Sequence, residues 1–190
     1  VDTYVVALTE KGQYGKALEV IEHWNKSISD EQFVLYWHEP IWKMVPLMAS
    51  GDSAGVIEMA RQLGPEHMAA PVRNAIIGLL ENNDNEDARE ILRSKANLDD
   101  KSGYDVEAYI ANLILIYAGD IDFSINRIIT DAHQGSFGNI EETWSPIYAE
   151  LRKHPRFEEY LELLNLPEYW DQAGWPEICQ RQDNGRIACQ

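Results

Sequence analysis

Acidic side chains are the most numerous groups in this 190-residue chain that could do chemistry, and two stretches concentrate them. The clusters are Glu81, Asp84, Glu86, Asp87 and Glu90, and then Asp99, Asp100 and Asp105. Grouped carboxylates can bind a divalent cation or share acid–base work. Both clusters fall where helix caps and solvated helix faces are expected, and a metal site needs ligands that converge. We therefore predict no metal site here.

The histidines show none of the spacings that zinc sites or hydrolases use. They are His23, His38, His67, His133 and His154. His38-Glu39-Pro40 begins like a zinc-protease motif but lacks its second histidine. Cys179 and His154 could form a nucleophile–base pair, yet no glycine-flanked nucleophile turn and no glycine-rich phosphate loop is present. We therefore expect a protein that is not an enzyme and that carries no cofactor.

The two cysteines, Cys179 and Cys189, stand ten residues apart in a polar tail. This spacing differs from that of a Cys-x-x-Cys metal or redox pair. Two interpretations stay open. The cysteines could close a small disulfide loop, which would indicate an oxidising compartment, or they could be two unrelated free thiols.

Aromatic side chains between residues 24 and 44 are the candidate binding residues. Phe33, Tyr36, Trp37 and Trp42 form the proposed patch, and Trp24 and Met44 flank it. Phe33 and Trp37 follow helical spacing, so packing between helices is the alternative interpretation. If a concave groove exists, an aromatic-lined pocket is expected here. That hypothesis fails if Trp37 and Trp42 are both fully buried.

An internal repeat indicates which elements position these residues. In each of four segments a leucine stands four places before a Gly or Asn. Counted from that Gly or Asn, a small or branched residue follows five places later and an apolar residue follows nine places later. The leucines are Leu8, Leu47, Leu79 and Leu115, and the turn residues are Gly12, Gly51, Asn83 and Gly119. The later positions are Ala17, Val56, Ala88 and Ser124, and then Ile21, Ala60, Leu92 and Ile128. A weaker fifth unit contains Leu151, Pro155 and Leu164.

Each repeated feature has a physical reason that predicts a helical hairpin. Gly or Asn tolerates the left-handed conformation that ends a helix, and Asp or Gln after it can cap the next helix. The small residue lets two helices approach closely, and stacking buries the apolar faces. The spacing predicts helices at 2–11, 14–27, 30–50, 53–64, 66–82, 85–95, 104–118, 121–134, 140–153 and 156–165. No segment shows strand alternation, so the predicted fold is all-α with about five stacked antiparallel hairpins.

The last residues resemble a cap on the helical stack. We divide the chain into a repeat domain, 1–165, and a capping segment with a tail, 166–190, which opens with a short turn near 167–173. Tyr169, Trp170 and Trp175 are expected to cover the exposed end of the stack, as terminal repeats require. The alternative is an aromatic ligand patch.

The charge balance is strongly acidic, with 32 Asp and Glu residues against 16 Lys and Arg residues and a formal net charge of −16. Such a field repels phosphate backbones and anionic lipid, so nucleic acid is not expected to bind this segment. The charge allows a basic partner without requiring one. No stretch reaches the ~18 apolar residues of a membrane span.

The repeat resembles the tetratricopeptide repeat, whose period is near 34 residues and whose turn carries Gly-Asp before a small residue. The best matches are Gly12-Gln13-Tyr14-Gly15-Lys16-Ala17-Leu18-Glu19 and Gly119-Asp120-Ile121-Asp122. The resemblance implies a right-handed superhelix that binds proteins. The aromatic and proline positions of the family are mostly absent, so the repeats are degenerate.

The C-terminal region resembles the ending of a group of bacterial tetratricopeptide proteins. The matching stretches are Leu151-Arg152-Lys153-His154-Pro155-Arg156-Phe157, residues 163–170 and residues 174–179. In that group the repeats follow a winged-helix DNA-binding domain or an adenylate cyclase domain, commonly with a membrane segment between. The resemblance implies the cytoplasmic or periplasmic portion of a signalling or transcription-regulating protein.

Three functions are consistent with these observations. The chain opens at Val1 without an initiator methionine or a signal peptide, so we expect the C-terminal interaction region of a larger protein. The leading hypothesis is a scaffold that binds a partner protein or peptide, and that partner could be basic. The alternatives are a sensor that binds a metabolite in the superhelix groove and a module that forms homodimers.

Overall fold

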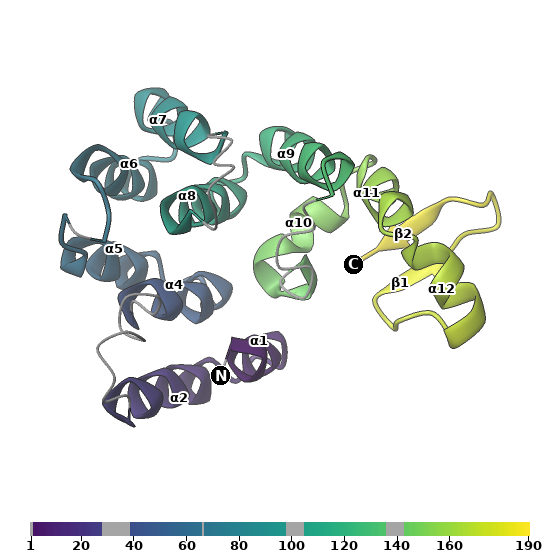
Figure 1. Ribbon diagram of the computed structural model, residues 1–190, viewed down its shortest axis with the longest axis horizontal. Coiled ribbons are helices and arrows are strands. Elements are labelled where there is room, and N and C mark those ends of the chain that lie inside the picture. The colour runs from purple at the N-terminus through teal and green to yellow at the C-terminus, as the bar shows by residue number, and fades with distance from the viewer. Residues whose placement is uncertain (1, 28–38, 66, 98–104, 136–142) are drawn as a thin grey trace.

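The structure is a computed structural model that describes residues 2–27, 39–65, 67–97, 105–135 and 143–190 (Figure 1). These residues are mostly helical and add one two-stranded sheet. The first helices are α1 (Asp2–Glu10), α2 (Tyr14–Ser27), α4 (Glu39–Ser50), α5 (Ser53–Gln62), α6 (Ala70–Glu81), α7 (Glu86–Ala96), α8 (Val106–Tyr117) and α9 (Ile121–His133). The later elements are a 3-10 helix η2 (Pro146–Tyr148), α10 (Ala149–Arg152), α11 (Phe157–Leu163), α12 (Leu166–Ala173), β1 (Cys179–Arg181) and β2 (Ile187–Cys189).

Three of the four predicted turns have the expected backbone. Gly12, Gly51 and Gly119 have φ values of 67°, 78° and 81°, a region that favours glycine. The turn at Asn83 differs from the prediction. There α6 ends at Glu81, the next residue, Asn82, has a φ of −142°, and the side chain of Asn85 caps α7 by accepting from the Ala88 amide at 3.1 Å. A longer turn with its own capping side chain therefore replaces the left-handed residue.

The residues that the repeat places five and nine positions after each turn lie mostly inside the molecule. The four small or branched residues after the turns, Ala17, Val56, Ala88 and Ser124, are all buried. The apolar positions four residues later are buried in the first three units, whereas Ile128 is half-buried and its neighbour Ile129 points into the core. The positions that the repeat predicts to face neighbouring helices are thus largely buried.

Neighbouring helices pack in chain order along a curved path (Figure 1). The second helix of each early hairpin contacts the first helix of the next: α2 contacts α4, α5 contacts α6, and α7 contacts α8. Figure 1 shows α10 on the inner side of this curve, and η2 contacts both α4 and α8. The chain's own residues therefore occupy part of the inner side.

The C-terminal region corrects three predictions. Instead of one helix at 140–153, the described part of that range contains only the 3-10 helix η2 and the four-residue α10. Residues 167–173, expected to form a short turn, belong to the two-turn helix α12. The expectation that no strand exists is wrong in the tail, where β1 and β2 pair antiparallel with Cys179 opposite Cys189. Strands of three residues are too short for an alternation pattern to be recognised.

The buried apolar residues form two clusters. The larger one is continuous from Met44 on α4 to Cys189 on β2. The smaller one comprises Val5, Leu8, Ala17 and Ile21, with Val20 and Trp42 packed against it. Among the described residues, the first hairpin thus has a core of its own.

Candidate functional site

The predicted aromatic patch lies largely outside the described residues, which exclude Phe33, Tyr36 and Trp37. Trp42 lies on α4, where its half-buried side chain packs against the small N-terminal cluster. The patch therefore stays a prediction.

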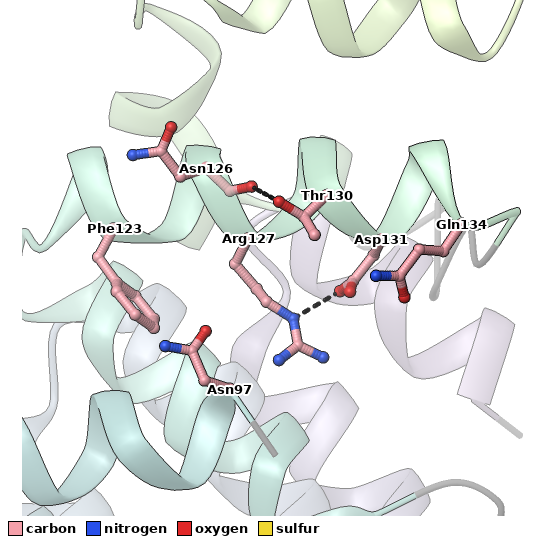
Figure 2. Close-up of a pocket in the computed structure, with 7 residues that line it drawn as sticks. All are labelled: Asn97, Phe123, Asn126, Arg127, Thr130, Asp131 and Gln134. Atoms are coloured by element: carbon pink, nitrogen blue, oxygen red, sulfur yellow. Dashed lines mark hydrogen bonds and ion pairs between the residues drawn. The ribbon is translucent and has the colours of Figure 1, made fainter. Parts of the chain in front are cut away.

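A pocket of about 320 Å³ lies along α9, beside the end of α7 (Figure 2). Most of its lining follows one stripe of α9, because residues three and four apart share a helix face. The lining residues are Asn97, Phe123, Asn126, Arg127, Thr130, Asp131 and Gln134. Asn97 directly follows the end of α7, so the pocket lies at the junction between two hairpins.

Arg127 forms the floor of this pocket and ties α9 to α7. Its Nε donates to Asp131 Oδ2 at 2.8 Å, and its Nη1 donates to the main-chain oxygen of Ala96. That oxygen belongs to the last turn of α7, where carbonyls lack helical partners. The guanidinium therefore caps α7. It also pairs with a carboxylate of α9, its own helix (Figure 2).

Two further polar groups of the lining are also bound within the protein. Thr130 Oγ1 donates to the main-chain oxygen of Asn126 at 2.8 Å, and Asn126 Oδ1 accepts from Arg156. Nearby on α11, burial raises the pKa of Tyr160 to about 12, and the Asp131 carboxylate adds to that increase. The Tyr160 hydroxyl therefore remains protonated and neutral over the ordinary pH range.

The groups that remain open to a ligand are two amides and one aromatic ring. The side chains of Asn97 and Gln134 are exposed, and no hydrogen bond to either is present among the described residues. Figure 2 shows the Phe123 ring facing Asn97 at one end of the pocket and Gln134 beside Asp131 at the other. Amide side chains both donate and accept hydrogen bonds, as peptide groups do.

Several members of the acidic clusters are engaged in ion pairs and caps. Glu86 Oε1 is 2.6 Å from Arg93 Nη1. Asp105 caps α8 through the Ala108 amide and lies 2.7 Å from Lys95 Nζ. Asp99 and Asp100 lie outside the described residues. Within the described ranges, no group of three or more His, Cys, Asp or Glu side chains could hold a metal ion.

The two cysteines are joined, with Cys179 Sγ 2.05 Å from Cys189 Sγ. His154 Nε2 lies 3.1 Å from Asp122 Oδ1, and its Nδ1 accepts from the Arg156 amide at 3.2 Å. Because the Cys179 sulfur is bonded to Cys189, it is not a free nucleophile in this structure.

The aromatic residues of the C-terminal region pack on one another. The Trp170 ring centroid lies 5.9 Å from that of Trp144 and 5.2 Å from that of Trp175, and Arg181 lies over the Trp175 ring. Tyr169, which we expected in the same cap, is 63% exposed and points away from the core. Position 169 lies on the solvent side of α12.

The fold and the pocket define a mostly helical protein with a pocket at the junction of two hairpins. Comparison with protein-family models, curated proteins and solved structures found no match for this chain. Among the described helices, none has both the length and the apolar character needed to cross a membrane. Sequence reasoning missed the pocket, although the spacing of Phe123, Arg127, Asp131 and Gln134 places them on one face of a helix.

Proposed function

We propose that this chain is a non-catalytic, tetratricopeptide-like interaction module that binds a peptide segment of a partner protein in the α9 pocket. The observation that carries the proposal is the pair of unengaged amides, Asn97 and Gln134, at the two ends of a pocket with an aromatic wall. A right-handed superhelix of hairpins and a place in a larger bacterial signalling protein belong to the same proposal.

A peptide fits the pocket because its main chain needs both donors and acceptors. The Asn97 and Gln134 amides offer both, and the Phe123 ring offers an apolar surface for one side chain. Arg127 and Asp131 neutralise each other at the floor, so the pocket itself favours an uncharged group. The net charge of −16 acts at longer range and speeds the approach of basic segments.

A metabolite sensor is the second candidate, and the pocket volume supports it. About 320 Å³ is at the lower end of the roughly 300–1,000 Å³ range of small-molecule sites. In either case, the Cys179–Cys189 bond favours an oxidising compartment. Self-association is a third hypothesis, which sedimentation of the purified chain tests directly.

The test is a peptide-display selection on the purified chain, followed by anisotropy titration of the enriched peptides. We expect Phe123→Ala and Gln134→Ala to weaken binding at least about tenfold, the effect of losing ~1.4 kcal/mol. Gln172→Ala, a matched change at an exposed glutamine of α12, should leave affinity unchanged. Circular dichroism checks that each variant folds.

Two results would count against the proposal. Peptides that bind the wild-type chain and the Phe123 and Gln134 variants equally well would place the binding surface elsewhere. A selection without enrichment, combined with a metabolite that raises the Tm of wild type but not of Phe123→Ala, would favour the sensor. Peptide affinity should also fall as salt increases if basic segments are steered by the acidic field.

A further inference from the structure

Arg152, at the end of α10, is a buried cation that is held by main-chain oxygens. Its side chain is 7% exposed; Nη1 donates to Thr143 O and Ser145 O at 2.8 Å each, and Nε donates to Gln190 O at 2.6 Å. Burial lowers its pKa, and the charge of Glu10 on α1 opposes that decrease. A buried charge must keep its hydrogen-bond partners, because each lost partner leaves it poorly solvated.

On one side, Arg152 anchors the segment that lies inside the curve. Ser145 O also accepts from the Tyr148 amide at 3.1 Å, which closes η2. Ile147 and Tyr148 are buried, and η2 contacts α4 and α8. Two of the three carbonyl contacts of Arg152, those with Thr143 and Ser145, therefore hold the segment that packs against these two helices.

On the other side, Arg152 depends on the disulfide-linked hairpin. Gln190 directly follows Cys189, and its amide donates to Ile178 O at 2.9 Å. Two three-residue strands are marginal as an isolated hairpin, and the Cys179–Cys189 bond closes this one directly beside Gln190. The Gln190 oxygen that accepts from Arg152 Nε thus lies next to a covalently linked residue.

We propose that the Cys179–Cys189 disulfide is a latch that holds η2 against α4 and α8 through Gln190 and Arg152. A dithiol reductant opens it. One reagent thiolate attacks a cysteine sulfur and forms a mixed disulfide, and the second reagent thiol then displaces that cysteine. Two electrons and two protons pass to the protein, which gains two thiols, while the reagent becomes a cyclic disulfide. The freed tail leaves Arg152, and the inner side of the curve opens.

A second contact makes the proposal open to refutation. Glu158 on α11 accepts from the Ile187 amide at 3.0 Å and lies 3.5 Å from Arg186 Nε. If this contact were sufficient to hold the hairpin, reduction would change nothing beyond the tail.

The test is hydrogen–deuterium exchange of the full chain, oxidised and then reduced with dithiothreitol, with iodoacetamide trapping to confirm two thiols. We expect reduction to speed exchange at least about tenfold in residues 143–152 and on α4 and α8, while α6 and α7 keep their protection. Arg152→Met, kept oxidised, should reproduce the change in residues 143–148. Reoxidation should restore the original pattern.

A Cys179→Ser/Cys189→Ser variant should show the open pattern and should not respond to dithiothreitol. If that variant fails to fold, reversible reduction of the wild-type chain decides the question. Faster exchange confined to residues 179–190 would overturn the latch. A uniform increase over every helix would also overturn it, because the disulfide would then act as a general stabiliser.

Discussion

The Asp120 carboxylate, at the first turn of α9, is only 9% exposed and faces two guanidinium groups of α7. It accepts from Arg93 Nε at 2.7 Å and lies 3.8 Å from Arg89 Nη1. The repeat pattern predicts Asp120 as a helix cap, but its side chain makes no capping hydrogen bond. The carboxylate interacts instead with Arg89 and Arg93 of the preceding hairpin. Asp120 therefore links α9 to α7.

Replacing Asp120 should therefore weaken the seam between these units. We expect Asp120→Asn to lower the free energy of unfolding by about 1–3 kcal/mol, because two partly buried guanidinium groups lose their charged partner. Asp122→Asn makes the same chemical change at a side chain that is 93% exposed and should cost less than about 0.5 kcal/mol. Urea denaturation measures both; equal losses would contradict the expectation.

The Tyr160 hydroxyl gives a prediction at alkaline pH. Burial raises its pKa to about 12 from an ordinary value near 10, so the folded state binds this proton more tightly than the unfolded state. The associated stability is present below pH 10 and is lost as the pH rises from 10 to 12. The stability of Tyr160→Phe relative to wild type should therefore rise by about 2 kcal/mol between pH 9 and pH 12.

Guanidinium denaturation at a series of pH values checks the Tyr160 prediction. Tyr169→Phe removes a hydroxyl from an exposed ring and provides the matched control. A difference between Tyr160→Phe and wild type that does not change with pH would contradict the expectation.

At the scale of the elements, the hairpin turns depend on glycine for backbone reasons. Gly119 has a φ of +81°, and an added Cβ would meet nothing within 4 Å, so conformation alone sets the cost of a side chain there. Gly15, on the first turn of α2, is equally unobstructed and has ordinary helical backbone. The two positions therefore separate conformational strain from crowding.

We expect Gly119→Ala to destabilise the protein by about 1–2 kcal/mol, the cost of a left-handed residue with a Cβ. Gly15→Ala should instead be neutral or stabilising by up to about 1 kcal/mol, because alanine favours the helix. Thermal unfolding of the two variants gives the comparison. The same sign of change in Tm for both would contradict it.

At the scale of the whole molecule, the two buried clusters predict regions of different stability. Leu8 belongs to the small cluster of α1 and α2, and Leu79 lies fully buried in the large one. A helical hairpin that buries less apolar surface unfolds locally more readily. Its amide hydrogens exchange through that local unfolding, so they exchange faster than those of a hairpin in the larger cluster.

Leu8→Ala should therefore speed hydrogen exchange on α1 and α2 and leave α6 to α9 nearly unchanged. Leu79→Ala should lower the free energy of the main unfolding transition by about 2–5 kcal/mol, as large-to-small substitutions do in a packed core. Exchange measured by mass spectrometry resolves the two regions. A Leu8→Ala effect spread evenly over all helices would show that the first hairpin shares one cooperative unit with the rest.

The sequence by itself determined the local features of this protein. Left-handed turns at Gly12, Gly51 and Gly119, the buried small residue five places after each, and the bounds of most helices follow from interactions between residues close in the chain. It also marked the C-terminal tryptophans as a packing group, although it placed Tyr169 among them incorrectly.

Tertiary structure alone decided which groups from different units meet. The Arg93–Asp120 pair, the α9 pocket with Asn97 at its edge, and the Arg152–Gln190 contact each join residues separated by more than two dozen positions. Sequence periodicity does not predict these contacts, because they depend on the angles at which successive hairpins pack and on the side of the helical stack to which the C-terminal tail returns. For the same reason η2 could not be placed on the inner side of the curve before the helices around it were positioned.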